Sequence, residues 1–176
     1  KMGLLVSQGL KAIHVYYWGP RYLGGGSPES SSHRVPTYAE INRAARAFGP
    51  ADEIIINGLR EPSRVAILYN RTSEMWGDGA EWRRTDRIYT FLALRQAHLP
   101  VDFVLEDDLT DERLQPYKVL YLNGVNLRRS AIAAVARWVE RGGLLCVAGA
   151  TALRDEYDDP LPEAAALFGV AQTPAG

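Results

Sequence analysis

Residues 118–148 read KVLYLNGVNLRRSAIAAVARWVERGGLLCVA and contain a complete strand–helix–strand pattern. Two short apolar runs, Lys118 to Leu122 and Leu144 to Ala148, flank a segment whose apolar residues recur at helical spacing, namely Ile132, Val135, Ala136 and Val139. The pair Gly142-Gly143 ends the predicted helix. Because apolar strands joined by a helix are typical of parallel sheets, this stretch predicts a β-α-β unit with a right-handed crossover.

The same alternation extends toward the N-terminus. Strands are predicted at Arg64 to Tyr69 and at Val101 to Leu105, with a loop over Asn70 to Gly79 and a helix over Glu81 to Leu99 between them. A short helical turn is predicted at Thr110 to Leu114. Strands that alternate with helices indicate the α/β class, with a doubly wound, mostly parallel sheet of the flavodoxin-like or amidotransferase-like kind.

The first sixty residues follow a different pattern. Ala12 to Trp18 is an aromatic and β-branched run that suits a strand buried on both faces. Thr37 to Phe48 predicts a helix that opens on a Thr-x-x-Glu capping box, and Ile54 to Ile56 predicts a short strand or a packed connector. We therefore expect two domains, 1–60 and 61–176. Since one helix on each side cannot cover such a strand, we expect the first to be a piece of something larger, less ordered or less buried than 64–170.

Composition excludes several classes of protein. Lys and Arg total 20 and Asp and Glu total 21, so a domain that binds nucleic acid through a basic excess is excluded. No apolar run approaches the roughly 18 residues that span a bilayer, and no membrane partner is expected. The single cysteine, Cys146, cannot form an intrachain disulfide. This favours a reducing, cytoplasmic compartment without establishing it.

The chemistry-bearing residues form no recognisable catalytic motif. The acidic groups 106–108 and 155–159 lack the spacing of a calcium loop and are interpreted as solvated loop ends and helix caps. The three histidines have no metal-ligand spacing, so neither a metal nor a cofactor is expected. Class I glutamine amidotransferases carry a nucleophilic cysteine on the turn after a strand, whereas Cys146 lies inside a strand. We interpret Cys146 as a buried core residue.

Residues 64 to 170 resemble the central trimerisation domain of glycoside hydrolase family 42 β-galactosidases, a domain similar in fold to the amidotransferases but without their nucleophile. The segments that carry the resemblance are RVAILY at 64–69, TSEMW at 72–76, PVDFV at 100–104, YKVLYL at 117–122 and WVERGGLL at 138–145. In that family the domain follows a catalytic (β/α)₈ barrel. Residues 9–18 look like the last barrel strand with its approach, and residues 37–48 look like the last barrel helix.

The resemblance implies a non-catalytic assembly domain that supports oligomerisation and shapes the active-site mouth of a parent β-galactosidase-like enzyme acting on a carbohydrate. Both catalytic carboxylates of the family come from earlier barrel strands, so no catalytic residue is assigned and the isolated chain is expected not to hydrolyse nitrophenyl galactosides. Trp18, and the displaced Arg21, stand where the family places an aromatic and a cation against the sugar. The other interpretation is that the aromatic residues at 16–18 are core or interface.

A homo-oligomer is expected through the second domain, with Trp76 and Trp82 as interface anchors, unless both tryptophans fold back onto their own sheet. Two other functions remain open. One is a stand-alone carbohydrate or small-ligand binding module on an amidotransferase-like scaffold, and the other is an amidotransferase or related hydrolase with a moved nucleophile. The full reading frame separates the first two interpretations, because a barrel upstream with two strand-end glutamates decides for the assembly domain.

Overall fold

The computed structural model describes residues 6, 9–12, 35–77, 81–147, 149 and 151–169, without the side chains of 35–37 and 81–85. The chain divides into two compact units, Lys1–Arg60 and Glu61–Gly176, and each is described by itself. The predicted strand at Ala12 to Trp18 lies outside the described residues except for Ala12.

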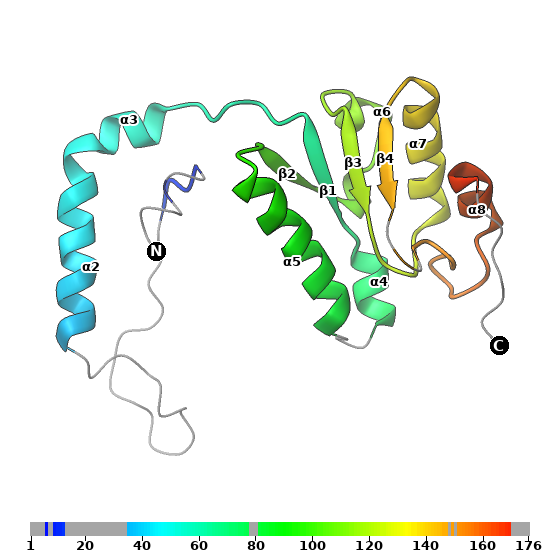
Figure 1. The fold of residues 1–176 in the computed structure, drawn as a ribbon, viewed down its shortest axis with the longest axis horizontal. Helices are drawn as coiled ribbons and strands as arrows, with labels where there is room; N and C mark the ends of the chain where they lie inside the picture. Colours follow the sequence, from blue (N-terminus) through cyan, green and yellow to red (C-terminus); the bar gives the residue numbers. More distant parts are fainter. Residues whose placement is uncertain are drawn as a thin grey trace, which may run out of the picture. The chain divides into compact units, whose positions relative to one another are not determined.

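The second unit is built on a four-stranded, all-parallel sheet (Figure 1). Its strands are β1 (Val65–Tyr69), β2 (Val101–Leu105), β3 (Val119–Leu122) and β4 (Leu144–Val147), in the spatial order β2-β1-β3-β4. The register pairs Val65 with both Val101 and Val119, and Val119 with Leu144. The α/β class and the parallel sheet predicted from the apolar runs are therefore confirmed.

Helices cover both faces of this sheet, as a doubly wound fold requires (Figure 1). They are α4 (Arg71–Trp76), α5 (Glu81–Gln96), the 3₁₀ turn η3 (Glu106–Asp108), α6 (Asp111–Leu114), α7 (Arg129–Glu140) and α8 (Pro162–Phe168). On one face α5 packs against β2, where the rings of Phe91 and Phe103 lie 5.3 Å apart. On the other face α6, α7 and α8 enclose the main core.

The main core follows the alternation of side chains along each strand. Ala66 and Leu68 of β1 and Leu120 and Leu122 of β3 point to the face that α7 covers, and all four are buried. The helix contributes its apolar stripe, Ala131, Ile132, Val135 and Trp138, which are also buried. Each such Leu, Ile or Val stabilises the fold by about 1.5–3 kcal/mol.

β4 is less buried than its apolar sequence predicts. Leu144 and Val147 are 59% and 42% exposed. Cys146 lies within the strand, as predicted, but it is only half-buried, so the prediction that it is a buried core residue is wrong. The reason is position, because β4 is the last strand at one edge of the described sheet. Cys146 pairs with Tyr121 of β3, where burial first and the neighbouring thiol second raise the pKa of the phenol.

The segment Asn70 to Gly79, predicted as a loop, contains the helix α4 instead. Its cap explains the difference, because the backbone N–H of Ser73 donates to Asn70 Oδ1 at 3.0 Å. An asparagine directly after a strand was therefore a readable helix-start signal.

The first unit contains α2 (Val35–Phe48), the 3₁₀ turn η2 (Gly49–Ala51) and α3 (Asp52–Asn57). The predicted helix at Thr37 to Phe48 is present, but Thr37 lies inside it and Glu40 pairs with Arg43, so the capping box is wrong. The strand or connector predicted at Ile54 to Ile56 is wrong as well, because these residues are helical. Ile54 is 77% exposed, and no side chain described in this unit is fully buried.

The difference in burial between the units predicts a difference in hydrogen exchange. Amides of α2 and α3 should exchange at least about tenfold faster than those of β1 and β3, because an element without buried contacts opens at a lower free-energy cost. Hydrogen exchange of the full chain followed by mass spectrometry measures this. Equal protection of both units would contradict the view that the first unit needs a surface outside this chain.

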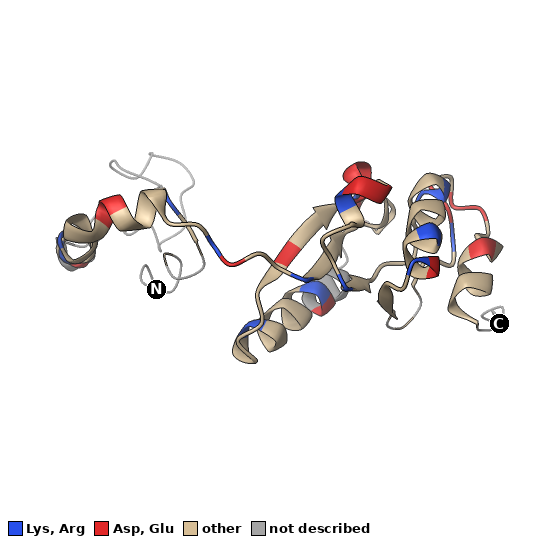
Figure 2. Ribbon diagram, turned by 90° about the horizontal axis from the view of Figure 1, so that it is seen from above, with Lys and Arg blue, Asp and Glu red and all other residues tan. Residues whose placement is uncertain are grey.

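Charge in the second unit is spread and paired rather than gathered by sign. In Figure 2 both acidic and basic positions occur along the ribbon of this unit, and the 3₁₀ turn Glu106–Asp108 is entirely acidic. Asp107 lies within ion-pair distance of Arg71 and Arg128, and Asp111 of Arg137 and Arg141. These ion pairs agree with the balanced numbers of acidic and basic residues in the sequence. Among the described residues, no helix is both long and apolar enough to cross a membrane.

Candidate functional site

Open parallel sheets bind ligands beyond the carboxyl ends of their strands, where the strand order reverses. Here the reversal falls between β1 and β3, since the chain runs from β1 outward to β2 and returns to β3 on the other side. The residues that leave these strands are Asn70 after β1, Glu106 after β2 and Asn123 after β3. Together with Asn126 and Asp155 they form what we call the carboxyl edge.

Asn70 bridges the point at which the strand order reverses. Its Nδ2 donates to the backbone carbonyls of Asn123 at 3.0 Å and Asn126 at 2.8 Å, while its Oδ1 accepts the N–H of Ser73. Asn70 is 2% exposed, so three of its hydrogen bonds are made away from water. The place where this fold would hold a ligand is therefore occupied by a side chain of the protein itself.

Glu106 closes the carboxyl edge from the side of β2. Its Oε2 accepts the backbone N–H of Thr72 at 2.7 Å, and its Oε1 accepts the backbone N–H of Arg128 at 2.9 Å. Thr72 lies in the first turn of α4 and Arg128 directly precedes α7. A single buried carboxylate thus serves the N-termini of two helices, where negative charge is favoured.

Asp155 is the buried carboxylate that organises the loop before α8. Its Oδ1 accepts the N–H groups of Tyr157 and Asp159, and its Oδ2 accepts from Arg129 Nε at 2.9 Å. Burial by itself would raise the pKa of this carboxyl, but the two backbone N–H groups and the Arg129 guanidinium outweigh burial and hold the pKa below its ordinary value. The interpretation of 155–159 as a solvated loop end is therefore wrong for Asp155, which is 1% exposed.

Gly124 lets the chain pass close to this network. Its φ of +94° suits glycine, and a Cβ at this position would lie 2.6 Å from Ser73 Oγ and 2.9 Å from Asn70 Nδ2. The glycine at position 124 is thus required by the close approach of the β3 exit to α4.

The carboxyl edge has the chemistry of a structural network rather than of an active site. The amide of Asn70 and the carboxylates of Glu106 and Asp155 all bind backbone groups of the chain itself. Cys146 lies within β4 rather than on the turn after it. Within the described ranges, no cluster of three or more His, Cys, Asp or Glu side chains is placed to hold a metal ion.

Beside the carboxyl edge lies a group of exposed large side chains, which we call the platform: Met75, Trp76 and Tyr157. Met75 and Tyr157 are 73% and 75% exposed, and half of Trp76 is exposed. Trp76 is held in place, because its Nε1 donates to the carbonyl of Glu156 at 3.0 Å. The alternative that Trp76 folds back is thus partly realised, since one edge of its ring is bound and the rest is accessible.

Several residues singled out by the sequence cannot be placed. Trp18 and Arg21, the predicted sugar-binding pair, lie outside the described residues, and the side chain of Trp82 is likewise outside them. Asn70 and Glu106 were not singled out as site residues. The position of each directly after a buried strand was the signal that could have found them.

Comparison with solved structures shows which proteins share part of this fold. A β-galactosidase from Bifidobacterium adolescentis matches with a TM-score of 0.50 and 24% identity over 57% of this chain and 46% of that chain. Gan42B, a family 42 β-galactosidase, matches with a TM-score of 0.58 and 20% identity over 73% of this chain and 19% of that chain. A catalytic mutant of the Gan42B enzyme from G. stearothermophilus matches with a TM-score of 0.57 and 19% identity over the same shares.

The solved neighbours are β-galactosidases. At these identities the likeness establishes the fold alone, and the chain spans less than half the length of each of these enzymes. No protein-family model matches the sequence, and no curated protein matches it either.

Proposed function

We propose that this chain is a non-catalytic assembly part of a β-galactosidase-like glycoside hydrolase of family 42. In this proposal residues 1–60 are the end of a (β/α)₈ barrel, and residues 61–176 hold subunits together and shape the mouth of the parent active site. The observation that carries the proposal is that the carboxyl edge, where this fold would bind a ligand, is filled by Asn70 and its partners while the platform beside it is exposed. The shared fold of solved β-galactosidases supports the parentage.

The first unit supports an origin in a barrel because an apolar face of its helix α2 is incompletely covered. One face of α2, with Tyr38, Ile41 and Phe48, is only half-buried. An apolar cavity of about 330 Å³ opens between this helix, α3 and residues 6, 10 and 11. A terminal β/α unit separated from the rest of its barrel would leave such a face incompletely covered, since barrel helices pack against their neighbours.

The platform supports an assembly role through the kind and the rigidity of its side chains. Trp, Tyr and Met are enriched in protein interfaces. Trp76 is already fixed by its hydrogen bond to the Glu156 carbonyl, so less side-chain entropy is lost when a partner covers it. The partner in this proposal is a second copy of the chain.

Replacement of Trp76 should weaken the self-association of the full chain. The Trp76→Ala variant is expected to raise the dissociation constant of self-association by at least about thirtyfold, since central aromatic anchors contribute about 2 kcal/mol or more. Multi-angle light scattering over a concentration series measures the change in mass.

The matched control is Tyr89→Ala on α5, which removes an aromatic side chain that is 65% exposed and lies outside the platform. It should associate like the wild type. A wild-type chain that is monomeric at every concentration contradicts the assembly role. Dissociation by Tyr89→Ala but not by Trp76→Ala places association on α5 and contradicts the platform.

A further inference from the structure

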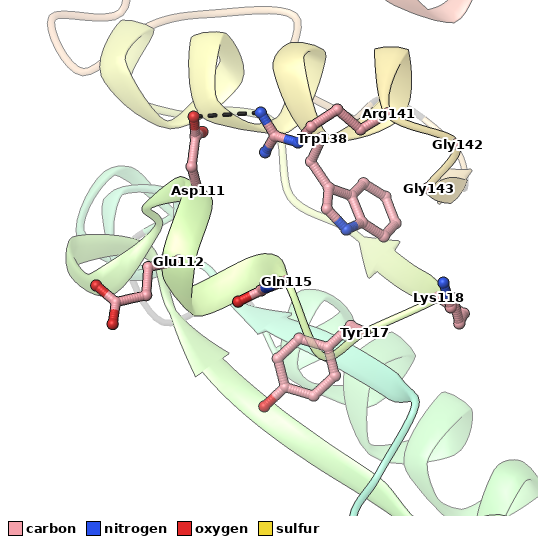
Figure 3. Close-up of a pocket in the computed structure, with 9 residues that line it drawn as sticks. All are labelled: Asp111, Glu112, Gln115, Tyr117, Lys118, Trp138, Arg141, Gly142 and Gly143. Atoms are coloured by element: carbon pink, nitrogen blue, oxygen red, sulfur yellow. Dashed lines mark hydrogen bonds and ion pairs between the residues drawn. The ribbon is translucent and has the colours of Figure 1, made fainter.

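A second feature of the molecule lies at the opposite end of the sheet from the carboxyl edge. A cavity of about 440 Å³ opens at the amino ends of β3 and β4, between α6 and the last turn of α7 (Figure 3). Its lining includes Gln115, Tyr117, Lys118 and Trp138. This volume lies in the range of small-molecule sites in proteins.

The indole of Trp138 is the unusual group in this cavity. Trp138 is 4% exposed, yet its Nε1 donates no hydrogen bond to any residue that the structure describes. Indole N–H groups normally have a hydrogen-bond partner. The nitrogen of Trp138 is not among the fully buried polar atoms without a partner, so its N–H can be reached from the cavity that the ring lines. In Figure 3 the indole nitrogen lies on the side of the ring that faces Gln115 and Tyr117.

The last turn of α7 prevents the ring from turning away. Gly142, with φ at +94°, donates its N–H to Val139, and Gly143 donates its N–H to the carbonyl of Trp138, so the chain folds back over the ring. A Cβ on Gly143 would lie 2.3 Å from the indole. The unsatisfied donor is therefore held in a fixed direction, as a binding site requires.

The charges around the cavity favour an acceptor ligand. Asp111, one of the two carboxylates that line the cavity, is committed to Arg137 at 3.1 Å and Arg141 at 3.2 Å. The hydrogen bond from Arg141 is the main reason that the pKa of Asp111 is lowered. The carboxylate of Glu112 points away from Trp138 in Figure 3.

Lys118 supplies the matching charge. Its ammonium group forms neither an ion pair nor a hydrogen bond with the described residues, and neither does the side-chain amide of Gln115. The indole N–H and the ammonium donate only, and the amide can donate as well, so the groups left free at this cavity are mainly donors.

We propose that this cavity binds a small organic anion whose carboxylate accepts hydrogen bonds from Trp138 Nε1 and from the Lys118 ammonium. The site is separate from the carboxyl edge and from the platform, and it does not depend on the proposed parentage. Gln115 contacts the same ligand through its amide.

The probe is glutarate, and the readout is the indole N–H resonance of Trp138 in ¹⁵N-labelled full chain. The sequence contains four tryptophans, so the indole region is simple and Trp138 can be assigned by triple-resonance spectra without a variant. At constant ionic strength, glutarate should shift this resonance saturably, with a dissociation constant on the order of 1 mM. Glutaramide, the neutral analogue, should bind at least about tenfold more weakly.

Lys118→Gln is expected to weaken glutarate binding about fivefold, as for the loss of one charge-assisted hydrogen bond at an exposed lysine. Arg46→Gln, which removes one positive charge from α2, should leave binding unchanged. An unshifted Trp138 resonance, or a shift unaffected by Lys118→Gln, overturns the proposal. If glutaramide or galactose shifted the Trp138 resonance as strongly as glutarate does, the proposal that the ligand is an anion would be wrong.

Discussion

Asn70→Ala is expected to lower the free energy of unfolding of the second unit by about 3 kcal/mol. The variant removes the N-cap of α4, worth about 1 kcal/mol. It also leaves the carbonyls of Asn123 and Asn126 without their buried donor, at about 1 kcal/mol each. Urea denaturation of the full chain followed by circular dichroism measures the loss.

Asn70→Asp separates the two roles of this residue, which are the N-cap of α4 and the bridge to the carbonyls of Asn123 and Asn126. An aspartate preserves the acceptor for the Ser73 N–H but places an oxygen where Nδ2 donates to two carbonyls, so it should destabilise at least as much as alanine. Asn57→Ala, at the exposed end of α3, is the control and should change stability by less than about 0.5 kcal/mol. If Asn70→Asp unfolded at the same urea concentration as the wild type, the hydrogen bonds from Asn70 Nδ2 would not hold the end of β1 to the end of β3.

Glu106→Ala is the second large effect, with an expected loss of about 3 kcal/mol. The carboxylate is 3% exposed and accepts two backbone N–H groups, from Thr72 and Arg128, and each such bond to a charged acceptor contributes about 1.5 kcal/mol or more. Its loss leaves the backbone N–H groups of Thr72 and Arg128 without their acceptor. Thermal and urea unfolding measure the loss.

Glu106→Gln should lose about half as much, because a carboxamide keeps one acceptor oxygen and turns a donor toward the other N–H. Asp108→Ala, an exposed residue of the same 3₁₀ turn, is the matched control and should be nearly neutral. If Asp108→Ala destabilised as much as Glu106→Ala, the effect would belong to the turn and not to the buried carboxylate.

These two residues explain why the carboxyl edge is better described as closed than as vacant. Asn70 and Glu106 hold the same positions, directly after parallel strands, from which other doubly wound proteins present ligand-binding groups. Here both side chains bond the protein's own backbone. A parent enzyme would therefore gain stability and surface from this unit rather than chemistry.

Local sequence was sufficient for the elements of the second unit. The apolar runs at 64–69, 101–105, 118–122 and 144–148 predicted the four strands, and the apolar spacing in 130–141 predicted α7. Periodicity encodes these elements because side chains repeat every second residue in a strand and about every 3.6 residues in a helix. The alternation of elements also indicated the parallel sheet, since parallel strands need crossover helices.

Tertiary structure alone decided which polar residues matter. The sequence showed three adjacent acids at 106–108. The backbone N–H groups that donate to the buried carboxylate of Glu106 come from residues 34 and 22 positions away in the chain. Asn70 reaches 53 and 56 residues along the chain, and Trp76 reaches 80. The exposure of β4 and the unsatisfied N–H of Trp138 likewise follow from strand order and helix packing. Such contacts depend on which strands become neighbours, which no local pattern of residues encodes.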